Sequence, residues 1–194
     1  MTEALVKAAV ELAQSLHYEE RHAEQVARLA LAIFDGLQQV HGLGDEAREV
    51  LHAAAILHDV GLSEEPQGHH KASQRIIAGA DALPVEGEDR QIIACVARYH
   101  RKALPSLDHA EFAALSADGR RLVEVLAAIL RVADGLDVTH RSLVASLAAE
   151  ASADRITIRC RTQGDAGAEA EKAIAKGDLF ERVFGRRLVA TVGP

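Results

Sequence analysis

The chain has 194 residues, enough to form one domain with a sizeable core, and 48% of them are hydrophobic. Alanine and leucine dominate, tryptophan is absent and only 3% of residues are aromatic, which disfavours a β-sandwich and predicts a mainly α fold. A formal net charge of −7 argues against the broad basic face that duplex nucleic acid requires, so no duplex partner is expected.

The N-terminal stretch MTEALVKAAVELAQSLHYEE carries acidic residues early and has no long uncharged apolar run. Neither a signal peptide nor a membrane span is therefore expected, and the protein is expected to be cytoplasmic, without a membrane partner. Cys95 and Cys160 lie far apart without the spacing of metal ligands, so we expect no disulfide framework.

Apolar residues recur with helical spacing along most of the first 140 residues or so. Helices are expected over residues 3–16, 20–40, 45–59, 69–79, 88–101 and 120–137. Asp45 and Asp118 are expected to cap the third and the last of these helices, and Gly61 to end the third. Residues 63–68 and 102–119 are expected to be irregular because of their proline, glycine and polar content.

The pattern changes after residue 142. SLAAEAS and RITIRCR are typical of short strands, AEAEKAIAKGDLFERVF is typical of a helix, and RLVATV is typical of a third strand. We therefore expect a helical core over residues 1–142 and a small α+β (ββαβ) appendage over residues 143–194. A homodimer through the appendage or the amphipathic helices would be an ordinary assembly for such a chain.

Four ionisable side chains fall on the apolar stripes of these helices, where they should point inward: His22, His58, His100 and Asp134. For one histidine alone, a hydrogen-bonded core role is the better interpretation. Several converging groups favour a divalent metal instead, because imidazole and carboxylate suit Mn, Mg, Fe, Ni, Co or Zn and coordination keeps a buried carboxylate ionised.

His58 and Asp59 are neighbours in the stretch AAAILHDVG. Neighbours on a helix project about 100° apart, so both can bind one ion only at a helix end, which Gly61 supplies. His22 and Asp134 have the orientation to contribute the third and fourth ligands. The order of ligands along the chain is then H…HD…D.

In this order of ligands the chain resembles the HD superfamily of metal-dependent phosphohydrolases. RHAEQVARLALAIFDGL, AAAILHDVG, ARYHRKALPS and ILRVADGLDVTH together resemble the HD domain of the exopolyphosphatase/guanosine pentaphosphate phosphatase (Ppx/GppA) family, and the tail KGDLFERVFGRRL resembles its C-terminal region. The resemblance covers nearly the whole chain. It implies an HD-domain helical bundle in which His22, His58, Asp59 and Asp134 are the ligands of one metal.

Related HD enzymes with two metals carry further histidines after the HD helix and near the next helix end. GHHKASQRII and RYHRK occupy those places and offer His69, His70 and His100, of which His70 and His100 are the expected ligands of a second metal. Members of the polyphosphatase group commonly read HS where this chain has Ala72 and Ser73. A second metal would therefore require His70, one turn earlier, as a substitute.

The resemblance implies hydrolysis of a phosphate ester or anhydride by attack of metal-bound water, with Asp59 in the catalytic centre. The expected substrate is a small phosphorylated molecule, with a nucleotide as the first choice. Lys71, Arg101 and Lys102 are the expected cations for its phosphoryl oxygens, and a solvated surface position is the alternative for each.

Full-length family members carry an N-terminal phosphatase half, so exopolyphosphatase activity is not carried over from the resemblance. The alternative function is a non-catalytic regulatory module that binds a metal and a phosphorylated ligand such as an alarmone or polyphosphate. A third interpretation keeps the cluster for structure alone. Neither a phosphate-binding glycine loop nor a GxSxG serine motif occurs in the sequence.

Asp137 lies one turn beyond Asp134, where it either orients a ligand or is a plain surface acid. Five histidines have positions that do not aim at the cluster, and an exposed role is expected for them. They are His17, His41, His52, His109 and His140.

Overall fold

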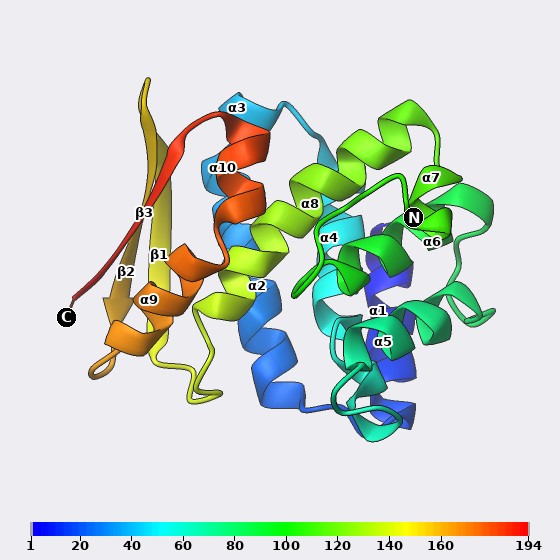
Figure 1. Cartoon of the computed structure of the whole chain (residues 1–194). Helices are drawn as coiled ribbons and strands as arrows, with labels where there is room; N and C mark the ends of the chain where they lie inside the picture. Colours follow the sequence, from blue (N-terminus) through cyan, green and yellow to red (C-terminus); the bar gives the residue numbers. More distant parts are fainter. Residues whose placement is uncertain (1, 194) are drawn as a thin grey trace.

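The computed structural model describes residues 2–193 and is mainly helical, with one three-stranded sheet near the C-terminus (Figure 1). The first part contains α1 (Thr2–Ser15), α2 (Glu20–Gly36), α3 (Gln38–His41), α4 (Asp45–Leu57), the 3-10 turn η1 (Val60–Ser63), α5 (His69–Ala78), α6 (Gly87–Arg98), α7 (Ala110–Ala113) and α8 (Ala117–Gly135). The second part contains β1 (Val144–Ala151), β2 (Arg155–Thr162), α9 (Gly167–Ala175), α10 (Asp178–Phe184) and β3 (Arg187–Gly193). The expectation of a mainly helical chain with a small C-terminal sheet is confirmed.

Two expected helices are interrupted. The helix expected over 20–40 ends at Gly36 and is followed by the short α3, and the helix expected over 168–184 is divided into α9 and α10 around Gly177. Both breaks fall at glycine, which has a low helix propensity. The segment 102–119, expected to be irregular, contains the single turn α7.

The N-terminal caps also differ from those expected. Asp45 is the first residue of α4, and Gly44 occupies the cap position. Ser116 caps α8, where its Oγ accepts a hydrogen bond from Gly119 N at 3.0 Å, and Asp118 lies in the first turn. An acid in the first turn also stabilises a helix through its dipole, so the sequence pattern alone does not separate a cap from a first-turn position.

The sheet has the order β1-β2-β3, with β1 antiparallel to β2 and β2 parallel to β3. β1 packs on α2, while α9 and α10 lie between β3 and α8 (Figure 1). The parallel pair requires a crossover, and α9 and α10 supply it. The topology is therefore ββααβ, where ββαβ was expected.

One apolar cluster extends through both parts of the chain. It includes Leu126 and Ile129 of α8 together with Ile156 and Ile158 of β2 and Phe180 of α10. The expected division at residue 142 stays a prediction, but the C-terminal elements share their core with the helices. In the part of the chain that the structure describes, no helix has the length and hydrophobicity to cross a bilayer.

The turn η1, which follows His58 and Asp59, packs directly on α5. A Cβ at Gly61 would lie 2.5 Å from His69 O and 2.5 Å from Ser73 N, and Gly61 N donates to Ser73 Oγ at 3.0 Å. Ala72, fully buried, faces the same glycine. Gly61 thus allows the close approach of η1 and α5. It lies within η1, and α4 already ends at Leu57, so the expectation that Gly61 ends the helix was wrong.

Gly61→Ala is expected to lower the free energy of unfolding by about 1–3 kcal/mol, because backbone atoms of α5 must move to admit a methyl group. Urea unfolding followed by circular dichroism measures the change. Gly79→Ala is the matched control, since its Cβ would meet its nearest neighbour, Arg75 O, at an ordinary 3.5 Å. Equal losses in both variants would contradict the expected role of the contact.

Candidate metal centre

The ends of five helices meet at one place and bring together histidine and aspartate side chains. These are His22 in the first turn of α2, His58 and Asp59 after α4, His69 at the start of α5, His100 after α6 and Asp134 in the last turn of α8. The histidines are 0–4% exposed. Such a concentration of polar groups in an apolar interior requires compensating partners.

The first cluster consists of His22, His58, Asp59 and Asp134. His22 Nε2 lies 3.4 Å from Asp134 Oδ1 and 4.0 Å from Asp59 Oδ2. His58 Nε2 lies 3.5 Å from Asp59 Oδ2 and 4.0 Å from Asp134 Oδ1. Ligand atoms bound at about 2.0–2.2 Å to one ion are separated by roughly 3–4.4 Å. The ligand atoms of His22, His58 and Asp59 therefore lie within reach of a single ion, and Asp134 contacts both histidines at the same place.

The second cluster consists of Asp59, His69 and His100. Asp59 Oδ1 lies 3.1 Å from His69 Nε2 and 3.4 Å from His100 Nε2. Asp59 thus directs Oδ2 to the first cluster and Oδ1 to the second. His100 is where it was expected, but His69 occupies the position expected for His70.

His70 is buried but lies outside both clusters. Burial, together with nearby cations such as Lys102, lowers its pKa to about 4. Adjacent residues on a helix project about 100° apart, so only one of His69 and His70 can face Asp59. The sequence contains no signal that selects between them.

Hydrogen bonds fix the ring orientation of His22, His58 and His100. The acceptors of their Nδ1 atoms are Asp137 Oδ2 at 2.8 Å, Ala55 O at 2.6 Å and Ala97 O at 2.6 Å, respectively. Because these oxygens accept, each Nδ1 carries a proton, so Nε2 is the ring nitrogen left to bind a metal. All three Nε2 atoms face the clusters.

The buried Nε2 atoms of His22 and His58 have no hydrogen-bond partner among residues 2–193. A buried polar atom without a partner costs about 1–3 kcal/mol. A divalent cation is a partner that both imidazoles accept, and the carboxylates of Asp59 and Asp134 would balance its charge. The donor set therefore fits a metal ion.

The electrostatics of the first cluster favour charged carboxylates. Burial alone raises the pKa of Asp59, but His58 and His69 outweigh this effect and hold the pKa well below its usual range. Burial alone lowers the pKa of His22, but the nearby carboxylates of Asp134 and Asp137 raise it to about 9. Without a metal, a proton on His22 thus offsets part of the negative charge.

Asp137 is fully buried and connects His22 to the loop after α8. Its Oδ2 accepts from His22 Nδ1, and its Oδ1 accepts from Ser142 N at 2.7 Å. Asp137 is therefore not a surface acid, and it fixes the orientation of the His22 ring.

His140 is a site residue that the sequence analysis missed. It is exposed, as expected, but its ring stacks on His22 with centroids 3.7 Å apart, and its Nδ1 lies 2.8 Å from Glu19 Oε2. Its backbone adopts a φ of +56°, which is uncommon for a residue other than glycine. The sequence analysis relied on helical and strand periodicity, which does not predict the conformation of a loop, so it could not place His140 at the site.

A cavity of about 530 Å³ opens onto both clusters. Five cationic side chains line it: Arg101, Lys102, Arg131, Lys172 and Lys176. In a chain with a net charge of −7, this concentration of positive charge fits an anionic ligand. Arg101 and Lys102 were predicted, whereas Lys71 is exposed and does not line the cavity.

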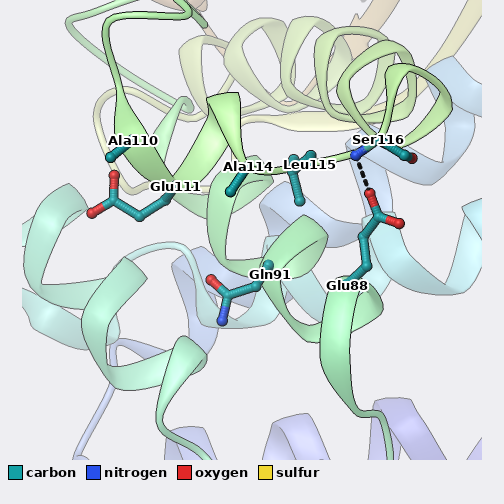
Figure 2. A pocket seen from close by; sticks show the side chains of 7 residues that line it. All are labelled: Glu88, Gln91, Ala110, Glu111, Ala114, Leu115 and Ser116. Atoms are coloured by element: carbon teal, nitrogen blue, oxygen red, sulfur yellow. Dashed lines mark hydrogen bonds between the residues drawn. The ribbon is translucent and has the colours of Figure 1, made fainter.

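A larger cavity of about 810 Å³ lies away from the clusters (Figure 2). Glu88 and Glu111 line it, and no histidine or cation does. Figure 2 shows the carboxylate of Glu88 accepting a hydrogen bond from Ser116 N. Its negative charge is unfavourable for a phosphorylated ligand, so the smaller cavity is the candidate site.

Comparisons with known proteins place this site within a family. Residues 6–179 match the family described as Ppx/GppA phosphatase, domain III, and this range contains both clusters and the cations of the cavity. A guanosine-5'-triphosphate,3'-diphosphate pyrophosphatase of Pseudoalteromonas atlantica is 29% identical over 132 residues, which are 66% of this chain and 25% of the relative. The chain thus spans about a quarter of the length of that relative. It belongs to the Ppx/GppA phosphatase family, where it corresponds to domain III.

Proposed function

We propose that this chain is an HD-type, metal-dependent phosphohydrolase that acts on a small phosphate ester or anhydride, with a nucleotide as the first choice. The observation that carries the proposal is the pair of unpartnered buried imidazole nitrogens on His22 and His58, which face Asp59 beneath a cation-rich cavity. Buried ionisable groups that converge beside a cavity are typical of functional sites.

One ion would be held by His22, His58, Asp59 and Asp134. A second ion would be held by Asp59 together with His69 and His100. Nitrogen and oxygen donors in this combination suit Mn, Fe, Co, Ni, Zn or Mg. When bound, such a cation lowers the pKa of a coordinated water and offsets negative charge on phosphoryl oxygens.

The protein's own side chains supply binding and orientation. Asp137 holds the ring of His22 by its hydrogen bond to Nδ1. Arg101 and Lys102 lie at the cavity and would bind phosphoryl oxygens through charge-assisted hydrogen bonds. The cavity volume of about 530 Å³ is in the range of sites for small molecules.

The proposal is tested by elemental analysis of the purified protein, followed by measurement of phosphate release from a panel of nucleotides with Mn, Mg, Ni or Co added. His58→Ala is expected to lower the release of phosphate by about a hundredfold or more, because it removes a ligand of the first cluster. His17→Ala, an exposed histidine outside the cavity, is the matched control and is expected to retain full activity.

A non-catalytic regulatory module is the alternative outcome of the same experiment. It would be supported if no substrate releases phosphate while a phosphorylated ligand raises the melting temperature, since a ligand that binds only the native state stabilises it. The absence of both effects would contradict the two functions together.

A further inference from the structure

The tail KGDLFERVFGRRL begins at the candidate site. Lys176 lies in the turn between α9 and α10, lines the cavity and has a side chain that is only 12% exposed. Its ammonium pairs with Asp134 Oδ2, while Asp134 Oδ1 lies 3.4 Å from His22 Nε2. The two oxygens of one carboxylate are therefore divided between the first cluster and Lys176.

Arg131 fixes this turn to the end of α8. The Arg131 side chain is 5% exposed, its Nε donates to Lys176 O at 3.3 Å, and its Nη2 donates to Asp178 Oδ1 at 2.9 Å. Nη1 donates to Tyr99 O at 3.1 Å, beside His100. A buried arginine with three acceptors holds its partners in one geometry.

The backbones of α8 and α9 are in close contact at the same place. A Cβ at Gly135 would lie 2.7 Å from Ala173 Cα and 2.8 Å from Ala173 N, so only glycine permits this approach. Together with Arg131, this contact makes the position of Lys176 part of the folded core. The lysine is not on a flexible tail.

We propose that Lys176 is a phosphate-binding residue of this centre, contributed by the C-terminal segment, and the inference rests on the proposed function. A buried ammonium needs a partner of opposite charge. A cation at the first cluster would be balanced by the Asp134 carboxylate, which is the present partner of Lys176. A phosphoryl oxygen in the cavity would then be the second partner of Lys176. Arg131 is then a positioning residue, because each of its three nitrogens already donates to Lys176 O, Tyr99 O or Asp178.

The test is calorimetric titration of inorganic phosphate into the Mn²⁺-loaded full chain. Lys176→Met is expected to weaken phosphate binding by about ten- to a hundredfold, the loss typical of one charge-assisted hydrogen bond. Lys176→Arg keeps the charge and is expected to bind phosphate within about threefold of the wild type. Lys7→Met is the matched control, because Lys7 is an exposed lysine on α1 that pairs with Glu11, away from the cavity.

Titration of Mn²⁺ into the same variants separates phosphate binding from a purely structural role. If Lys176→Met binds phosphate as tightly as the wild type, the inference is wrong. It is also wrong if Lys176→Met and Lys176→Arg both lose Mn²⁺ and phosphate together, because the lysine then acts only through Asp134. Melting temperatures identify a variant that fails to fold, and Lys176→Gln then replaces Lys176→Met.

The two proposals fail in distinguishable ways. A wild-type chain that binds phosphate through Lys176 but hydrolyses nothing contradicts the proposed hydrolase alone. A wild-type chain that releases phosphate with a KM unchanged in Lys176→Met contradicts the inference alone.

Discussion

Asp59→Asn is expected to abolish metal binding at both clusters and to lower the release of phosphate by about 10³-fold or more. Asp59 belongs to both clusters, with Oδ2 3.5 Å from His58 Nε2 and Oδ1 3.1 Å from His69 Nε2. Asparagine keeps the shape of the side chain but removes the negative charge, and its amide group presents a donor where a ligand atom is required. Elemental analysis after equilibration with Mn²⁺ measures the number of ions per chain.

Variants of the individual clusters make the result specific. His22→Ala is expected to remove the ion of the first cluster, and His69→Ala that of the second, so each variant is expected to retain one ion where the wild type holds two. Asp81→Asn is the control for the same chemical change, since the side chain of Asp81 is 97% exposed. Two ions retained by Asp59→Asn would contradict the proposed role of this residue.

Mn²⁺ affinity is expected to rise about tenfold between pH 7 and pH 8 because of His22 alone. Burial lowers the pKa of His22, but Asp134 and Asp137 raise it to about 9, so the metal must displace a proton below that pH. Calorimetry in buffers of different ionisation enthalpy is expected to show about one proton released at pH 7 from this residue. His22→Gln is expected to lose this proton release.

The same shift affects the stability of the metal-free protein, with a sign that follows from its direction. The pKa of His22 is about 9 in the folded chain and 6.5 at its ordinary value, so the protonated form is favoured by folding. Its contribution is fully present below about pH 6.5 and is lost as pH rises towards about 9, a difference on the order of 3 kcal/mol.

Urea unfolding in EDTA at pH 6.5 and pH 9 measures this difference. The wild type is expected to lose more stability between the two pH values than His22→Gln does, because the variant lacks the titrating group. The same loss in both proteins would show that other groups dominate in this window.

Much of the fold follows from local sequence patterns. Apolar residues at helical spacing and the alternating strands after residue 142 depend on neighbours within a few positions, and the elements that they predicted are present. The caps at Asp45 and Asp118 and the uninterrupted helix over 168–184 were wrong. Capping depends on single hydrogen bonds, and a helix break at a glycine depends on what packs against it. Apolar periodicity in the sequence predicts neither of these.

The candidate site divides in the same way. His22, His58, Asp59 and Asp134 were selected because a polar residue on an apolar stripe must face the interior, and the structure brings all four together. Their role as metal ligands stays a prediction. His70 was predicted as a ligand of the second metal, whereas His69 is the residue that faces Asp59. The sequence does not show which of two adjacent helical residues points toward the cluster.

The sequence by itself determined most of the helices, which side chains point inward, and the order of histidines and aspartates on which the resemblance to a phosphohydrolase family depends. The tertiary structure decided that Arg131 and Lys176 belong to the site, that His140 stacks on His22, and that Lys71 lies outside. Those placements depend on contacts between segments separated by tens of residues, such as α8 with the turn after α9. Their geometry is set by packing of the whole chain, and a local pattern contains no information about it.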